Sequence, residues 1–385
     1  MSKYLGKKIG VFASGGLVSW VVCRYLAENG AQVVALLADV GQEDGDWIEN
    51  YISDMDRLHV HIVRRDLRNN LAKVALTMVR YNSHYDGGYW NSTGALRYML
   101  AKGFQKDLSN HSFNFFSHGC VGGGNDQLRF HLYGRHFLRP ARELVMWDQI
   151  DFKKRFPSRA SMVDYILEAG DYKGLKAKID NSTDASLIGV SYEGSGFEEP
   201  GFDITTIPPK MSRWPWQAVD AYADIAIGFE KGLATHLNGD RLSPFQLLQK
   251  INSLAGFHGV SLRSSFEDRI NSTKCRGIYE SPGMDVLAQA FQALLSMSIH
   301  SADRKWIEAA QSLLGRLMYE GKWNSAVADR KRWELDAILN KINGTVKIRL
   351  YKGNICTIGI LDHRRNNKVV FQKRFAGGGH VWNDY

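Results

Sequence analysis

Short apolar runs alternate with amphipathic segments over the first third of the chain. Residues 9–13, 32–37, 59–63 and 113–117 are apolar runs of strand length. The segments 17–28 and 96–104 repeat their apolar residues with helical spacing, and Asn29 with Gly30 forms a C-cap for the first of them. This alternation predicts an α/β fold with a doubly wound parallel sheet, which binds ligands at the carboxyl ends of its strands.

The remaining residues mix helical and strand patterns, so they predict a second domain of the α+β class. Ser243 begins a helix that has proline at its first position and Gln246 as the capping-box partner. Further helices are predicted at 161–168, 284–299 and 303–319, and a hairpin at 346–350 and 356–361. We therefore predict domains at 1–170 and 171–362, followed by a basic tail at 363–385.

Two glycine loops lie where predicted strands end. Ser14, Gly15 and Gly16 stand between the strand 9–13 and the following helix. Backbone N–H groups and the positive helix end make such a turn a cradle for phosphate. The loop matches neither the Walker sequence nor the dinucleotide fingerprint. The segment 117–129 joins a second glycine run to amide, carboxylate and guanidinium groups, although either loop alone is also compatible with an ordinary surface turn.

With both loops considered, the chain resembles argininosuccinate synthase, a family of N-type ATP pyrophosphatases. Five segments match in the family's order, namely 12–20, 38–42, 117–129, 182–193 and 274–282. The resemblance implies a nucleotide-binding domain at 1–170 and a synthetase and oligomerisation domain at 171–362. It also implies ATP with Mg²⁺ as cofactors. In that family the ureido oxygen of citrulline attacks ATP and expels pyrophosphate, and the amine of aspartate then displaces AMP.

The resemblance assigns site residues by position. Arg129 suits a substrate carboxylate, Glu267 suits an ammonium group, and no protein side chain is expected to bind the metal, because ATP phosphates carry Mg²⁺. The catalytic residues would be Asn125, Asp126 and Arg129. The ATP-binding residues would be Phe12, Ala13, Ser14, Gly15, Gly16, Ser19, Ala38, Gly119 and Cys120. The citrulline-binding residues would be Tyr89, Asn125, Arg129, Ser182, Ser191, Glu267 and Tyr279, and the amine-binding residues Thr93, Val121, Asn125 and Asp126.

Departures from the family pattern fall mainly on the pyrophosphate and aspartate sides. In the first loop, Val18 and Trp20 replace an aspartate and a serine of the family pattern. In the central loop, Val121 and Gly123 replace a threonine and a lysine. Gly94 replaces a serine that the family places near citrulline. Two hypotheses follow. The chain is a diverged ligase of specialised metabolism that joins a ureido amino acid to aspartate or another amine, or it is a catalytically weakened paralogue that binds citrulline or a nucleotide. A tRNA-modifying pyrophosphatase is a weaker alternative, since the chain lacks a catalytic cysteine pair.

The net charge, the cysteine spacing and the lengths of the apolar runs limit the kinds of partner and the cellular location that we expect. A net charge of +9 suits anionic small molecules, and because the basic residues are scattered we expect no nucleic-acid surface. Four cysteines without close spacing predict reduced thiols and a cytoplasmic location. No apolar stretch reaches the roughly 18–20 residues of a membrane helix, and glycines interrupt the uncharged run 9–23 that imitates a signal peptide. We expect a homo-oligomer, with a tetramer favoured.

Overall fold

The computed structural model describes residues 3–42, 45–110, 113–120, 123–168, 182–193 and 196–362, without the side chains of residues 45–47, 110, 182 and 193. Val121, the side chain of Ser182 and the predicted tail 363–385 therefore lie outside the described residues.

The first sheet is the predicted doubly wound parallel sheet, with strands in the order β3-β2-β1-β4-β5. All of its neighbouring strands pair in parallel. The strands are β1 (Lys8–Ala13), β2 (Gln32–Asp39), β3 (His61–Asp66), β4 (Phe115–His118) and β5 (Arg142–Val145). The strand order reverses between β1 and β4, and the two glycine loops follow these two strands. Both loops therefore meet at the point where such sheets bind ligands.

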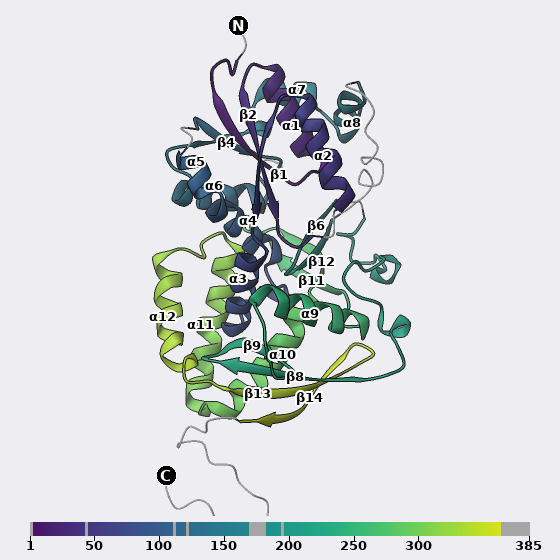
Figure 1. The fold of residues 1–385 in the computed structure, drawn as a ribbon, viewed down its shortest axis with the longest axis vertical. Helices are drawn as coiled ribbons and strands as arrows, with labels where there is room; N and C mark the ends of the chain where they lie inside the picture. The colour runs from purple at the N-terminus through teal and green to yellow at the C-terminus, as the bar shows by residue number, and fades with distance from the viewer. Residues whose placement is uncertain are drawn as a thin grey trace, which may run out of the picture.

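Helices cover both faces of this sheet (Figure 1). One face carries α1 (Leu17–Glu28), α2 (Gly45–Arg57), α7 (Ile150–Arg155) and α8 (Arg159–Leu167). The other carries α4 (Ser92–Gly103), α5 (Gln105–Asn110) and α6 (Asn125–Phe137), whereas α3 (Arg68–Arg80) packs on α4 and on α9 (Pro244–Phe257) and α10 (Pro282–Ser298) of the other half of the molecule. Along β2, Val33 and Ala35 face the first layer, whereas Val34 and Leu36 face the second, because successive strand side chains alternate.

Two antiparallel sheets form the rest of the described chain. A four-stranded sheet has the order β11-β12-β7-β6, and a five-stranded sheet has the order β10-β9-β8-β13-β14. The smaller sheet contains β6 (Ser182–Ser186), β7 (Gly189–Glu193), β11 (Arg263–Asp268) and β12 (Lys274–Glu280). The larger contains β8 (Ala223–Glu230), β9 (Leu233–Leu237), β10 (Asp240–Arg241), β13 (Gly344–Tyr351) and β14 (Asn354–Leu361). The accompanying helices are α9 (Pro244–Phe257), α10 (Pro282–Ser298), α11 (Ser301–Tyr319) and α12 (Ala326–Leu339).

One hydrophobic core joins the parallel sheet to the larger antiparallel sheet. Its buried residues run from Phe12 on β1 through α3, α4 and α10 to Leu350 on β13. The smaller sheet lies between the two ends of the molecule, where β6 contacts α4 (Figure 1). None of the helices in the described ranges is long and apolar enough to cross a membrane.

Local patterns placed several elements correctly and missed others. Ser243 and Gln246 form the predicted capping box at the start of α9. The strand predicted at 59–63 begins only at His61, because His59 adopts a left-handed φ of 55° just after α2. The helices α2, α3 and α12 were not predicted from the sequence.

Trp20 stands in the core beneath the first glycine loop. Its side chain is 2% exposed and packs in the cluster that α1 and α2 form against the sheet, where it also interacts with Asp54. The loop therefore has no hydroxyl group at the position of the family serine, because the Trp20 indole packs in the core instead.

This placement predicts a large stability effect. Trp20→Ser leaves a cavity and should lower the free energy of unfolding by about 3–5 kcal/mol, as for other buried tryptophan truncations. Urea unfolding followed by circular dichroism measures it, with Trp20→Phe as the matched control that should lose much less. A loss below about 1 kcal/mol for Trp20→Ser would contradict the core position.

Candidate active site

The first glycine loop has the backbone of an anion cradle. Gly15 adopts a φ of +73°, which glycine tolerates, and Gly16 begins α1. No side chain of the described residues caps this helix end, and the Gly16 N–H donates to the Ser14 hydroxyl at 3.3 Å. The first-turn N–H groups of α1 are therefore oriented to receive an anion. Ser19, also predicted to bind ATP, donates its hydroxyl to the Gly16 carbonyl at 2.9 Å.

The second glycine loop packs directly on the first. A Cβ added to Gly119 would lie 3.2 Å from the Val18 Cβ, so any larger residue would have to push the two loops apart by a few tenths of an ångström. The Cys120 N–H donates to His118 Nδ1 at 3.3 Å, and His118 Nε2 lies 3.0 Å from the Glu143 carboxylate. His118 therefore carries its proton on Nε2 and holds the start of the loop through Nδ1.

Two further residues predicted to bind ATP are core residues by their side chains. Phe12 and Ala38 are both buried, and the Phe12 ring lies 4.9 Å from the Phe130 ring. Their side chains pack beneath the two glycine loops, so only their backbone atoms could contact a polar ligand.

Arg97, Arg129 and two aspartates form a partly buried charge cluster, in which only Arg129 is fully buried. Asp126 Oδ1 accepts from Arg129 Nη1 at 2.7 Å, and its Oδ2 accepts from Arg97 Nη2 at 3.0 Å. Arg97 Nη2 also donates to Asp184 Oδ2 at 2.7 Å. Burial alone would raise the pKa of Asp126, but the two guanidinium groups outweigh it and hold the pKa below its ordinary value. Asp126 is therefore a fixed negative charge.

Tyr319, at the end of α11, joins the central loop to β11. Its hydroxyl donates to Glu267 Oε1 at 2.9 Å and accepts from Asn125 Nδ2 at 3.0 Å. Its carbonyl accepts from Arg129 Nε at 2.8 Å. The Asn125 amide oxygen accepts from the Ile270 N–H at 3.2 Å, so both ends of the Asn125 amide are held.

Stacked tyrosines form a wall beside this cluster. Tyr89 stacks on Tyr279 with ring centroids 3.8 Å apart, and its hydroxyl accepts the Thr93 N–H at 3.1 Å. The Thr93 and Ser191 hydroxyl groups lie 3.3 Å apart. The structure thus brings together Tyr89, Thr93, Asn125, Asp126, Arg129, Ser191, Glu267 and Tyr279 from the predicted set.

Three buried polar atoms in this region lack a well-formed hydrogen bond within the described ranges. They are the donors Arg97 Nε and Arg129 Nη2 and the acceptor Glu267 Oε2. Burial raises the pKa of Glu267, although the Tyr319 and Tyr279 hydroxyl groups oppose the rise. Buried polar groups are normally paired. Two cationic donors and one carboxylate oxygen complement a ligand that carries a carboxylate and an ammonium group.

Sequence reasoning missed Arg97, Asp184 and Tyr319. Arg97 lies one helical turn after Thr93 and Asp184 lies two residues after Ser182, so helix and strand periodicity place each on the same face as a predicted residue. That spacing could have identified both. Tyr319 has no comparable signal, because it ends a distant helix.

Gly94 has a packing reason. A Cβ there would lie 2.9 Å from the Met318 carbonyl oxygen, so the family serine could fit only if α4 and α11 moved apart. Gly123, by contrast, adopts a φ of +78° and has nothing within 4 Å of its added Cβ.

The described chain offers no side-chain cluster for a metal ion. No group of three His, Cys, Asp or Glu residues within it has metal-binding geometry, and Val18 supplies no oxygen beside the cradle. The residues present thus fit a magnesium ion only as one carried by nucleotide phosphates.

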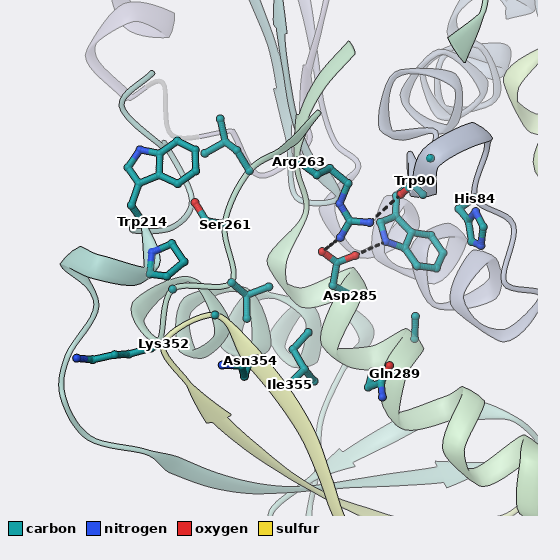
Figure 2. Close-up of a pocket in the computed structure, with 18 of the residues that line it drawn as sticks. His84, Trp90, Trp214, Ser261, Arg263, Asp285, Gln289, Lys352, Asn354 and Ile355 are labelled. Carbon is teal, nitrogen blue, oxygen red and sulfur yellow. Dashed lines mark hydrogen bonds and ion pairs between the residues drawn. The ribbon is translucent and has the colours of Figure 1, made fainter. Parts of the chain in front are cut away.

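An open hollow of about 830 Å³ lies elsewhere, between the Trp214 segment, α10 and the β13–β14 turn (Figure 2). Arg263 pairs with Asp285 at its wall, and the Trp90 indole N–H donates to Asp285 at 2.7 Å. None of the predicted site residues lines it.

The parallel sheet, with paired glycine loops at the point where its strand order reverses, defines a doubly wound α/β protein. Residues 8–169 match the family described as arginosuccinate synthase N-terminal HUP domain, and residues 181–376 match its C-terminal domain. The chain belongs to the argininosuccinate synthase family.

Relatives agree over nearly the whole length. Argininosuccinate synthase of Syntrophobacter fumaroxidans is 33% identical over 377 residues, covering 96% of this chain and 90% of that protein. The Psychrobacter cryohalolentis enzyme is 31% identical over 387 residues, covering 96% and 89%. A U34-tRNA thiolase from Methanococcus maripaludis overlaps 45% of this chain and 60% of that one, with 11% identity and a TM-score of 0.29, which is too low to inform the fold or the function.

Proposed function

We propose that this protein is an ATP-dependent carbon–nitrogen ligase. It adenylates the ureido oxygen of citrulline or a close analogue, releases pyrophosphate, and joins the activated carbon to an amine with release of AMP. Family membership supports the reaction class. The observation that carries the substrate class is that Arg97 Nε, Arg129 Nη2 and Glu267 Oε2 have no well-formed hydrogen bond to the described residues, a set that complements an amino acid zwitterion.

Each side chain then has a role set by its contacts. The cradle at Ser14–Gly16 holds the departing pyrophosphate, and backbone groups of Gly119 and Cys120 approach the α-phosphate. Arg129 Nη2 binds the substrate carboxylate and Glu267 binds its ammonium group. Acceleration comes mainly from positioning and charge stabilisation, because the substrates supply the reacting atoms.

The amine is aspartate or another amine. Asn125, Asp126 and Thr93 border its side of the site, while Val121 and the Ser182 side chain enter this proposal from the sequence alone. The domain limits 1–170 and 171–362, Mg²⁺ carried by ATP, a homotetramer, a cytoplasmic location and a role in specialised metabolism belong to the same proposal.

Isotope exchange tests the reaction class directly. With citrulline and Mg²⁺ present, the protein should exchange labelled pyrophosphate into ATP, and full turnover should yield AMP. Exchange without a ureido compound is the background control. Formation of ADP and phosphate, or no citrulline-dependent exchange and no turnover across a panel of ureido compounds and amines, would refute the proposal.

Arg129 provides a test of the substrate pocket. Arg129→Ala removes a buried partner of the substrate carboxylate and should weaken citrulline binding by about 2–5 kcal/mol in calorimetry. Arg129→Lys is the matched control, which keeps the charge but loses the fork of donors and should give an intermediate value. ATP binding by each variant checks the fold, since the cradle does not contact Arg129. Equal citrulline affinity in wild type and Arg129→Ala would contradict the assignment.

A second candidate function, the weakened citrulline- or nucleotide-binding protein, is favoured by one observation. Val18 packs on Gly119 where the family places a carboxylate, so the junction of the two loops is apolar.

Val18→Asp separates the two functions. For a ligase that lacks a hard oxygen near Mg²⁺, the substitution should raise citrulline-dependent exchange about tenfold, equivalent to about 1.4 kcal/mol of barrier. Trp20 is left unchanged because it belongs to the core, and Val18→Asn controls for polarity without charge. A fall in exchange would show that the apolar junction suits this enzyme's own substrates. Undetectable pyrophosphate exchange in both the wild type and Val18→Asp would favour the binding function.

A further inference from the structure

The second step of the proposed reaction needs a proton acceptor. The amine of a free amino acid is almost fully protonated near neutral pH, because it is a stronger base than the amino terminus of a peptide, and only the unprotonated nitrogen can attack. Asp126 is the nearest candidate by family position, but Arg129 and Arg97 occupy both of its oxygens at 2.7 and 3.0 Å. A carboxylate held in this way is a weak base.

Asp184 has a different environment. It lies on β6 opposite Ser191 of β7, so it stands beside Thr93 and the amine side of the site. Within the described part of the chain its hydrogen bonding involves Oδ2 alone, which accepts from Arg97 Nη2 at 2.7 Å. Its side chain is 30% exposed, against 20% for Asp126, so an incoming molecule can reach it.

The two carboxylates share one guanidinium nitrogen, so each disfavours ionisation of the other. Burial, followed by the charge of Asp126, raises the pKa of Asp184 above its ordinary value, although Arg97 and Arg129 oppose the rise. The pKa of Asp126 moves the opposite way. Two neighbouring carboxyl groups whose surroundings shift their pKa values in opposite directions are typical of an acid–base site.

We propose that Asp184 is a catalytic residue that accepts the proton of the incoming amine, while Asp126 remains ionised and orients that amine. The inference rests on the ligase function proposed above and names a role that the family resemblance did not assign.

The amine nitrogen enters with three protons, and Asp184 takes the first, which leaves a lone pair for attack on the adenylated carbon. The C–N bond forms, the C–O bond to AMP breaks, and AMP leaves with that bonding pair as its anion. The second N–H proton passes to water as the product guanidinium forms, and Asp184 returns its proton to solvent.

A structural role is the competing explanation, because the same carboxylate ties β6 to α4 through Arg97. The variant Asp184→Asn distinguishes the structural role from the catalytic role. Its amide oxygen can still accept a hydrogen bond from Arg97, but the amide cannot act as a base. We expect citrulline-dependent pyrophosphate exchange within about twofold of wild type, because the first step needs no amine. Ligation should fall about 100-fold or more, as is usual when a general base is removed.

Amines of graded basicity provide the decisive readout. Hydroxylamine is mostly unprotonated at neutral pH, so Asp184→Asn should convert it with citrulline at nearly the wild-type rate, measured as hydroxyarginine by mass spectrometry. Aspartate and the more basic methylamine should show progressively larger losses. Equal losses for all three amines, or an equal loss of exchange, would overturn the catalytic role in favour of a structural one.

The pH profile gives an independent check. The charged groups that face Asp184 are Arg97 from α4 and Asp126 with Arg129 from α6. Because the basic form is required, wild-type ligation should fall as pH drops through the raised pKa of Asp184, and Asp184→Asn should lose this dependence. An unchanged acid limb in the variant would overturn the proposal. Absence of citrulline-dependent exchange in wild type would instead refute the ligase function itself.

Discussion

The site depends on the guanidinium group of Arg97, which bonds Asp126 on α6 and Asp184 on β6 at once. Removing charges from water is costly, and an ion cluster is stable only when every charge has a partner. Two arginines and two aspartates satisfy this condition here. The cluster thereby fixes the β6–β7 hairpin against α4, and with it the position of Ser191 beside Thr93.

A second set of contacts closes the opposite side. Tyr319 bonds Asn125, Glu267 and Arg129, while its ring stacks on Tyr85 at 3.8 Å. The contacts of Tyr319 require the end of α11 to pack against α6. Because Gly94 has no Cβ, α4 can also pack closely against this end of α11. The candidate site is thus assembled from segments far apart in sequence, on both sides of the boundary between the two family domains.

This assembly explains what could be predicted from the sequence. The strands β1 and β2 and the Ser14–Gly16 loop are local patterns, so their positions followed from periodicity and turn chemistry. The start of α6 at Asn125 did not, because its first turn faces the site with polar residues and shows no apolar stripe. The spacing of Arg97 from Thr93 and of Asp184 from Ser182 could place each residue on the side of the site, but their pairing with each other joins positions 87 residues apart and has no local signal. Trp20 shows the reverse case: alignment placed it at the phosphate loop, but its position on α1 turns it into the core.

The departures from the family pattern can now be separated by what they affect. Leaving a buried charged donor or acceptor unpaired costs about 1–3 kcal/mol or more, so a chain without a ligand for this pocket would gain stability by losing such groups. Arg97, Arg129 and Glu267 nevertheless each carry an atom without a well-formed hydrogen bond to the described residues, which supports the proposed recognition of an amino acid. Val18 and Gly119, by contrast, make an apolar contact at the loop junction, where a charge would assist the departure of pyrophosphate in the proposed reaction. In the proposed ligase, recognition of the amino acid and activation of ATP therefore rest on different residues, so substitutions at the loop junction would change the second and leave the first intact.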